Sequence, residues 1–173
     1  MESVERAVAT LKGKLGPDVL GVEVFRGQTT VVVNRDAIMM ACKILHDDPA
    51  LDFDLLAALT AVDYWPEEPR FAVVYQLYSL SKNVFLGLRV PLQGDSPELP
   101  TVEAVYPNAN WHEREIYDMF GIIFRGHSDL RRILLPHDWQ GHPLRKDHPL
   151  GYEEVQFSFN FDEIERRKRY AKE

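Results

Sequence analysis

The side chains best suited to chemistry gather in one part of this 173-residue sequence, between positions 110 and 150. Five of the six histidines fall there, together with two clusters of charged residues. The first cluster lies on a predicted helix and consists of Glu113, Arg114, Glu115 and Asp118; the second consists of His127, Asp129, Arg131 and Arg132. Side chains of these types can transfer protons, bind metal ions or form ion pairs.

The spacing of these residues disfavours both proton transfer and metal binding. Glu115 and Asp118 are three positions apart on one helix, so they lie side by side, whereas an acid/base pair works across a cleft. His137 and His142 are five positions apart in a segment rich in proline and glycine, and no H-E-x-x-H or C-x-x-C pattern accompanies them. One alternative stays open, namely a small autonomous enzyme in which His142, Asp138 and Glu115 converge in a pocket.

Arg131 and Arg132 are the natural partners for the helix carboxylates, because a guanidinium group matches a carboxylate with two parallel hydrogen bonds. The charges could form an internal network that fixes the turn after the helix. Some of them could instead face a partner protein, where the loss of water strengthens each ion pair. The sequence leaves both interpretations open for Glu113, Arg114 and Arg131.

The stretch from residue 136 to residue 150 contains too many prolines and glycines for a helix or a central strand. It nevertheless carries Trp139, two leucines, three histidines and the basic pair Arg145-Lys146. We therefore predict an extended segment packed along its own surface or a neighbour's, since tryptophan and arginine are favoured in interfaces. Residues 152–161 then alternate between apolar and polar side chains, which fits a docking arm or a strand added to the chain's own sheet.

The elements that must position these residues mix helices and strands without a strict βαβ repeat. Periodicity predicts helices over 4–15, 38–45 and 111–119, the last of them ended by Gly121, and a hairpin over 20–33. It predicts strands over 71–80 and 84–92, the first with Phe71, Val73, Tyr75 and Leu77 on one face. It also predicts a helical turn over 54–59, a short helix after Thr101, and a capping box formed by Asn110 and Glu113.

The predicted fold class is therefore α+β, with a mixed, largely antiparallel sheet and helices packed on it, followed by an extended C-terminal docking segment. Residues 1–135 form the predicted core domain, and residues 136–173 form the extended segment and tail.

The composition restricts the classes of function. With 20 basic and 27 acidic residues the chain carries a formal charge of −7, which disfavours binding to nucleic acid. Because Cys42 is the one cysteine, a disulfide framework, a cysteine-based zinc site and an iron–sulfur cluster held by this chain alone are excluded. Cys42 lies on an apolar helix face and is predicted to be a core residue. No signal-like or membrane-spanning stretch is visible, and we expect a soluble protein in a reducing compartment.

Two runs of the sequence resemble the signatures of one family. The first motif comprises EREIYDMFGI at 113–122 and GHSDLRRIL at 126–134, and the second motif is DWQGHPLRKDHPL at 138–150. Together they resemble the 30 kDa subunit, also called the C-type subunit, of proton-pumping NADH:quinone oxidoreductase (respiratory complex I). The likeness is strong over residues 50–150, and its departures, Ser128 and His148, are small.

That resemblance implies a cofactor-free structural subunit in the hydrophilic arm of the complex. It would pack against the quinone-site subunit (49 kDa or D-type) and near the subunits that carry iron–sulfur clusters. Flavin and clusters would sit in those partner subunits, and the complex would couple electron transfer from NADH to quinone with proton pumping. The chain would lie at the cytoplasmic side of the cell inner membrane, touching the membrane only through the complex. Because it ends soon after the second motif, we expect a separate C-type subunit, not a chain fused to the D-type subunit.

The resemblance assigns no catalytic, cofactor-binding or metal-binding residue to this chain, and it makes the two motifs the partner-docking region. The predicted docking residues are Glu113, Arg114, Glu115, Asp118, His127, Asp129, Arg131, Arg132, Trp139, His142, Pro143, Arg145, Lys146 and Asp147. Equivalent subunits of membrane-bound hydrogenases and of ferredoxin- or deazaflavin-dependent complexes remain an alternative, which the sequence of the neighbouring quinone-site subunit would decide.

Overall fold

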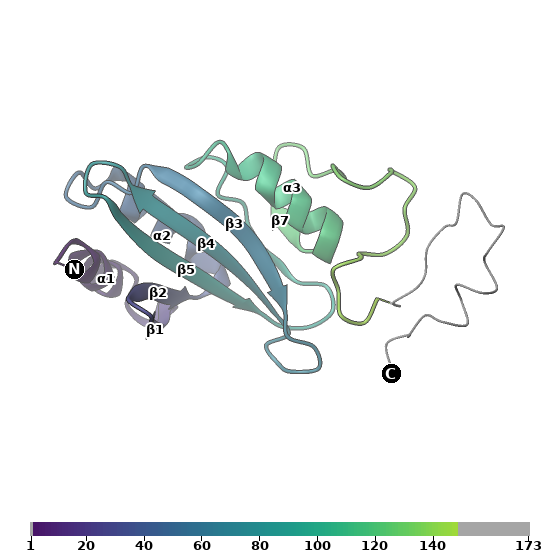
Figure 1. The fold of residues 1–173 in the computed structure, drawn as a ribbon, viewed down its shortest axis with the longest axis horizontal. Helices are drawn as coiled ribbons and strands as arrows, with labels where there is room; N and C mark the ends of the chain where they lie inside the picture. Colours follow the sequence, from purple (N-terminus) through teal and green to yellow (C-terminus); the bar gives the residue numbers. More distant parts are fainter. Residues whose placement is uncertain (1, 149–173) are drawn as a thin grey trace.

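The computed structural model describes residues 2–148, whose strands form a five-stranded and a two-stranded sheet (Figure 1). The helices are α1 (Glu2–Leu15), α2 (Ile38–Asp47) and α3 (Ala109–Phe120), with 3₁₀ helices η1 (Gly16–Asp18) and η2 (Arg35–Ala37). The strands are β1 (Val19–Phe25), β2 (Gln28–Val33), β3 (Leu55–Asp63), β4 (Phe71–Ser79), β5 (Val84–Leu92), β6 (Glu98–Pro100) and β7 (Ile123–Arg125). Within this range no helix combines the length and the apolar character that crossing a membrane requires.

The large sheet has the strand order β1-β2-β5-β4-β3, and every neighbouring pair in it is antiparallel except β2 with β5. The small sheet pairs β6 with β7 in parallel. This arrangement confirms the predicted α+β class and the mixed, largely antiparallel sheet. The division of the chain at residue 135 stays a prediction, and residues 149–173 of the predicted tail lie outside the described residues.

The spacing of apolar side chains decides which face of the sheet is covered. In β4, Phe71, Val73, Tyr75 and Leu77 are fully buried, and each such side chain contributes about 1.5–3 kcal/mol to folding. The core that receives them also contains Leu11 of α1, Cys42 of α2 and Ile116 of α3. The three helices therefore pack on the same face of the sheet, with α3 alongside β3 (Figure 1).

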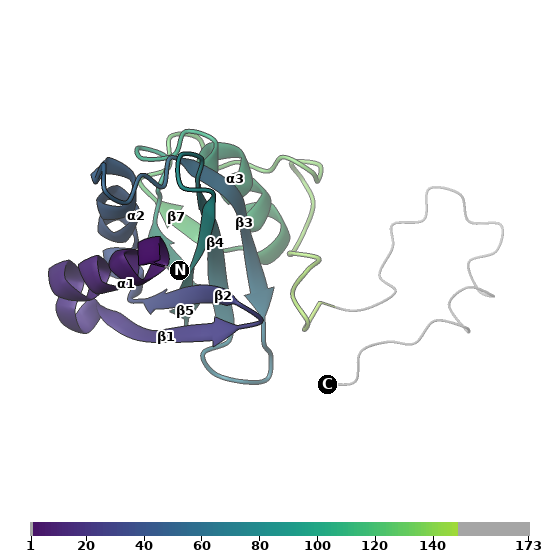
Figure 2. The same ribbon diagram turned by 60° about the vertical axis from the view of Figure 1, so that its left-hand side comes forward.

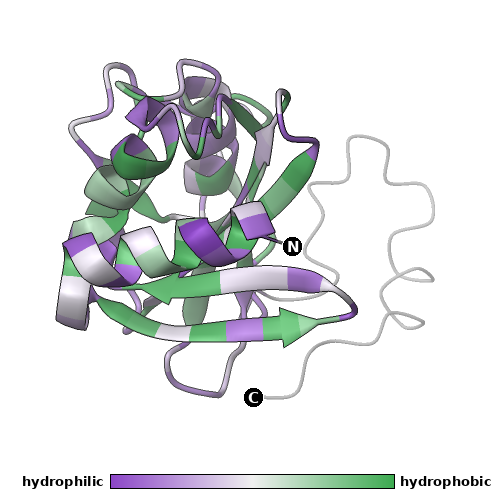
Figure 3. Ribbon diagram, turned by 90° about the vertical axis from the view of Figure 1, so that its left-hand side faces the viewer, coloured by the Kyte–Doolittle hydropathy of each residue, from purple (hydrophilic) through white to green (hydrophobic). Residues whose placement is uncertain are grey.

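Helix α1 lies beside the β1–β2 hairpin (Figures 2 and 3). The side chains of the two elements leave an apolar groove between them. The groove has a volume of about 660 Å³ and is lined largely by Val4, Val8, Val22, Val24 and Val84. Because the Val24 side chain remains 70% exposed, α1 covers this side of the hairpin only in part.

Two local predictions are wrong, and long-range partners explain both. Residues 54–59 form no helical turn, because β3 begins at Leu55 and pairs with β4 over its length. The segment after Thr101 forms turns and no helix, since Thr101 Oγ1 accepts the backbone N–H of Glu103 and donates to the carboxylate of Glu113. In both places tertiary contacts override the local helical tendency.

Helix α3 ends at Gly121, as predicted, and this position needs glycine for two reasons. Its φ of 72° is in the left-handed region, where its N–H caps the helix by donating to the Tyr117 carbonyl at 2.9 Å. A Cβ atom would also lie 2.5 Å from the His142 ring and 2.8 Å from the Arg145 guanidinium. The end of α3 is thus shaped for close approach by the second motif.

Gly121→Ala should lower the free energy of unfolding by about 1–3 kcal/mol, because the new methyl group strains the backbone and displaces two side chains. Gly13→Ala in α1 is the matched control: no atom lies within 4 Å of its added Cβ. That change should raise stability by about 0.5–1 kcal/mol. Urea unfolding measures both, and an unchanged midpoint for Gly121→Ala would contradict this account.

Candidate partner-docking site

Asp118 is the centre of the contacts at the C-terminal end of α3, and it is fully buried. Its Oδ2 atom accepts the backbone N–H groups of Ile133, Leu134 and Leu135 at 3.0, 2.8 and 2.9 Å. Its Oδ1 atom accepts a 2.6 Å bond from Arg132 Nη1. Burial by itself would raise the pKa of Asp118, but these donors outweigh it and hold the pKa below its usual value. The ionised carboxylate therefore ties the loop to the helix.

The second motif supplies donors to the last carbonyl groups of α3, which have no partners inside the helix. The backbone N–H of Leu144 donates to the Met119 carbonyl oxygen at 3.0 Å. Arg145 Nε donates to that of Phe120 at 2.6 Å, and His142 Nδ1 donates to that of Asp118 at 2.9 Å. Figure 1 shows this segment passing around the end of α3. The predicted extended segment is thus packed along the chain's own surface over the part that the structure describes.

Arg132 joins the two motifs. While its Nη1 atom holds Asp118, its Nη2 atom donates to the carbonyl oxygens of Trp139 and Gly141 at 2.9 and 3.0 Å. One planar guanidinium group therefore fixes the helix, the loop that follows it and the bend of the second motif, a geometry that a lysine ammonium could not reproduce.

Arg70, immediately before β4, holds the far end of the second motif. Its side chain is only 5% exposed, and it donates to both oxygens of Asp63 at 3.2 and 3.1 Å. It also pairs with Asp95 and Asp147, each at 2.8 Å. The backbone N–H of Lys146 adds a 2.9 Å bond to Asp63.

This arrangement makes Asp63 and Arg70 part of the site, although neither is among the predicted docking residues. Burial tends to raise the pKa of Asp63, but hydrogen bonds from Arg70 and from backbone N–H groups hold it below its usual value. The available signal was a carboxylate at the end of one apolar strand and an arginine just before the next, which pair when the strands are antiparallel neighbours.

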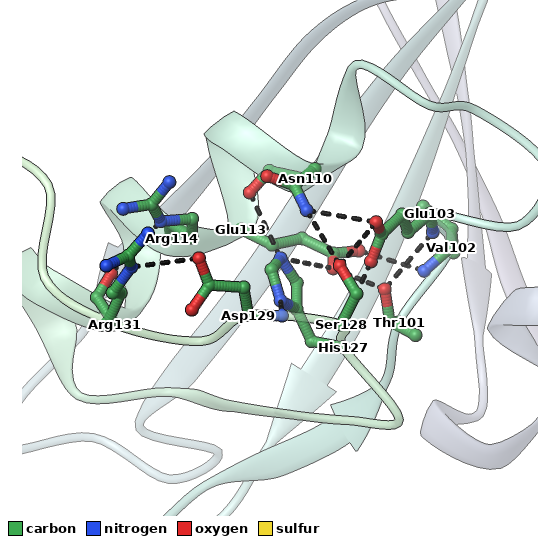
Figure 4. A network of polar contacts seen from close by, with 10 residues as sticks. All are labelled: Thr101, Val102, Glu103, Asn110, Glu113, Arg114, His127, Ser128, Asp129 and Arg131. Atoms are coloured by element: carbon green, nitrogen blue, oxygen red, sulfur yellow. Dashed lines mark hydrogen bonds and ion pairs between the residues drawn. The ribbon is translucent and has the colours of Figure 1, made fainter.

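A further network surrounds Glu113, which is fully buried in the first half of α3 (Figure 4). Its carboxylate accepts Thr101 Oγ1 at 2.5 Å and the backbone N–H of Val102 at 2.9 Å, and His127 Nε2 lies 3.9 Å away. Burial outweighs these contacts and raises the pKa of Glu113 to about 7.

The predicted capping box is wrong. Asn110 lies inside α3, and its side-chain amide donates to Glu103 at 2.9 Å and to Ser128 at 3.1 Å (Figure 4). His127 Nε2 lies 3.1 Å from the Asn110 carbonyl oxygen. These side chains join α3 to the turn after β7, and Glu113 turns toward the segment after β6 in place of its own helix end.

The prediction that two neighbouring arginines neutralise the helix carboxylates is half right. Arg132 pairs with Asp118, whereas Arg131 pairs with Asp129 at 2.8 Å and its side chain is 74% exposed. Such an exposed pair contributes only about 0–1 kcal/mol to stability. Arg114 bonds to backbone carbonyl oxygens of the same loop, with Arg131 beside it in Figure 4.

The remaining predicted docking residues vary in exposure. Glu115 lies on the exposed side of α3, Lys146 is exposed, and Trp139 and Pro143 are half-buried. The structure thus brings the two motifs together around the end of α3, while the docking role of each residue stays a prediction.

The autonomous-enzyme alternative requires His142, Asp138 and Glu115 to converge. A pocket of about 430 Å³ lies beside α3, and none of these three residues lines it. His142 is instead bonded to the end of the helix. Among residues 2–148, no three histidine, cysteine, aspartate or glutamate side chains are grouped so that they could hold a metal ion.

Comparison of the sequence with known proteins finds the same family by two routes. A family model described as "Respiratory-chain NADH dehydrogenase, 30 Kd subunit" matches residues 31–154. The chain is 48% identical over 163 residues to the C-type subunit of NADH-quinone oxidoreductase from Roseiflexus sp. (strain RS-1), covering 94% of each chain. It is 45% identical over 150 residues to the protein of the same name from Geotalea uraniireducens (strain Rf4), covering 87% of this chain and 90% of that one.

Two solved structures share the fold. A trypsin-resistant fragment of Nqo5 is 34% identical with a TM-score of 0.62, covering 74% of this chain and 99% of that one. A chain in the structure of a membrane-bound sulfane sulfur reductase, an archaeal respiratory membrane complex, is 26% identical with a TM-score of 0.70, covering 85% of each.

The raised pKa of Glu113 predicts a pH dependence of stability. Between the ordinary value of 4.5 and the folded value of about 7, the folded protein keeps a proton that the unfolded chain has released. The retained proton stabilises the folded protein, and this stabilisation is complete below pH 4.5. As the pH rises to about 7 it is lost, which lowers the free energy of unfolding by up to about 3 kcal/mol. Glu113→Gln should abolish that decline in urea unfolding measured across this range. Glu115→Gln, an exposed carboxylate on the same helix, is the control that should run parallel to the original protein. Parallel curves for Glu113→Gln would refute the assignment.

Proposed function

The chain belongs to the family of the 30 kDa subunit of respiratory-chain NADH dehydrogenase, and we propose that it is a cofactor-free structural subunit in the hydrophilic arm of a proton-translocating NADH:quinone oxidoreductase. In this role it holds electron-carrying subunits in place while NADH is oxidised and quinone is reduced. The observation that carries the proposal is the likeness to the C-type subunit, which extends over 94% of both chains.

The contacts of the two motifs favour a positioning role over catalysis by this chain. Asp118, Arg132 and Arg145 each bond to neighbouring parts of the same fold, where they hold the second motif against α3. A general acid or base must reach the proton that it transfers, and the Asp118 carboxylate is instead surrounded by four donors of its own chain.

The proposed partners follow from the same family. The chain packs chiefly against the quinone-site subunit, of the 49 kDa or D-type, and near the cluster-bearing subunits of the hydrophilic arm. Flavin and iron–sulfur clusters belong to those partners and not to this chain. It resides at the cytoplasmic side of the cell inner membrane and contacts the membrane only through the complex.

A second candidate is the equivalent subunit of a membrane-bound hydrogenase or of a ferredoxin- or deazaflavin-dependent complex. The likeness to a chain of the sulfane sulfur reductase favours it, because that protein is a respiratory membrane complex of another kind. Its identity to this chain is 26%, against 48% for the Roseiflexus relative, so NADH:quinone oxidoreductase is the better supported function.

Purification of a tagged copy from a mild detergent extract of its native host tests the proposal. The quinone-site subunit and the subunits carrying flavin and clusters should be recovered with it, together with NADH-dependent quinone reduction. Recovery with a hydrogenase catalytic subunit and no NADH-oxidising subunit would favour the second candidate. Recovery of the tagged chain only as a free monomer would contradict both.

Arg145→Glu should lower the amount of assembled complex and the NADH:quinone activity in parallel, because Arg145 caps α3 through the Phe120 carbonyl and carries no electrons. Native gels and activity measurements on the same preparations give the activity per assembled complex, which should stay unchanged. Arg6→Glu, at an exposed position of α1, is the control and should alter neither quantity. Lost turnover in a fully assembled Arg145→Glu complex would count against the structural role.

A further inference from the structure

The pocket beside α3 has an unusual charge balance. Its volume is about 430 Å³, and its lining residues are Arg114, Tyr117, Leu130, Arg131, Arg132, Leu135 and His137. Three of these carry a guanidinium group, and none carries a carboxylate. The pocket is therefore lined by cations on a chain whose formal charge is −7.

Carboxylates outside the lining neutralise two of the three arginines. Arg132 pairs with the buried Asp118, and Arg131 pairs with Asp129. Arg114 differs from both: within residues 2–148 it forms no ion pair, although only 9% of it is exposed. The pocket thus retains one uncompensated positive charge in the described part of the chain.

The surroundings of Arg114 fix its direction without neutralising it. Its Nε and Nη2 atoms donate to the backbone carbonyl oxygens of Arg131 and Arg132 at 3.2 and 3.4 Å. Its guanidinium carbon lies 5.2 Å from the centre of the Trp111 ring. The side chain is therefore held in one orientation at the pocket, so an incoming anion would meet a preorganised donor.

We infer that this pocket, the Arg114 pocket, receives an acidic side chain of the adjoining subunit. The inference rests on the proposed function, because it assumes that a subunit packs against this face. A guanidinium on a residue that is nine-tenths buried is costly to leave without a counter-ion, and residues 2–148 supply none. A carboxylate matches its planar fork with two parallel bonds.

The edges of the Arg114 pocket favour a protein over a free anion or a lipid headgroup. Trp111, which contacts Arg114, and Leu134, which precedes the lining residue Leu135, are each 61% exposed. An exposed tryptophan beside a buried arginine is typical of the centre of a protein interface. The net negative charge of the chain also disfavours the approach of small anions and acidic lipids.

The first test is a zero-length cross-link in the assembled complex. Arg131→Lys keeps the charge at the pocket and introduces an amine that a carbodiimide can join to a carboxylate in direct contact. Mass spectrometry should then identify a bond from position 131 to an aspartate or glutamate of another subunit. Arg6→Lys on α1 is the matched control and should give no such bond. Bonds from position 131 only to carboxylates of its own chain, such as Asp129, would overturn the inference.

The second test measures retention of the partner. Arg131→Glu changes a 74% exposed side chain, so the fold should be kept, and thermal unfolding of the variant checks this. Recovery of the adjoining subunit at moderate salt should fall about tenfold, whereas Arg6→Glu should leave it unchanged.

The outcomes separate the inference from the proposed function. If wild-type complex is recovered and Arg131→Glu retains its partner equally well, the Arg114 pocket is not a contact although the chain is a subunit. If the tagged wild-type chain brings down no other subunit, the proposed function falls and the inference falls with it.

Discussion

The buried carboxylate of Asp118 is the interaction on which the rest of the site depends. An ionised carboxylate removed from water costs several kcal/mol unless donors replace its hydration. Four donors do so here, and three of them are consecutive backbone N–H groups that converge only if the loop after β7 turns sharply over the end of α3. The same turn of the loop also places Arg132 where its side chain reaches the second motif. One buried charge thus determines the course of the chain on both sides of it.

The charges of the two motifs therefore divide by role. Asp118, Arg132 and Arg145 bond to their own chain and hold the fold, although Arg132 also lines the surface pocket. Their clustering in the sequence thus reflects internal architecture. Arg114 and Arg131 lie at the surface pocket, where one positive charge has no partner in the described part of the chain. A rigid scaffold with one cationic recess suits a subunit that positions its neighbours, because a preorganised contact loses little entropy on binding.

Sequence reasoning succeeded where a residue's environment follows from its near neighbours. The alternation of β4 and the glycine stop of α3 are of this kind, since a pleat of period two and a left-handed cap are local properties. It failed at the first part of β3, residues 55–59, whose strand form depends on pairing with β4, and at Glu113, whose partner Thr101 is twelve residues upstream. Sequence reasoning also missed the backbone N–H groups that surround Asp118. Every residue type except proline has such a group, so the sequence cannot indicate which of them will bind a carboxylate.

Cys42 lies at the centre of the core, and burial raises the pKa of its thiol far above neutral pH. The thiolate is the form that attacks maleimides and is oxidised, so the Cys42 thiol is unreactive in the folded protein. Since the sequence contains no other cysteine, one introduced at the surface would be the sole reactive thiol of the folded chain. The fold thereby provides a background on which a single spectroscopic label can be placed at a chosen surface position of this chain.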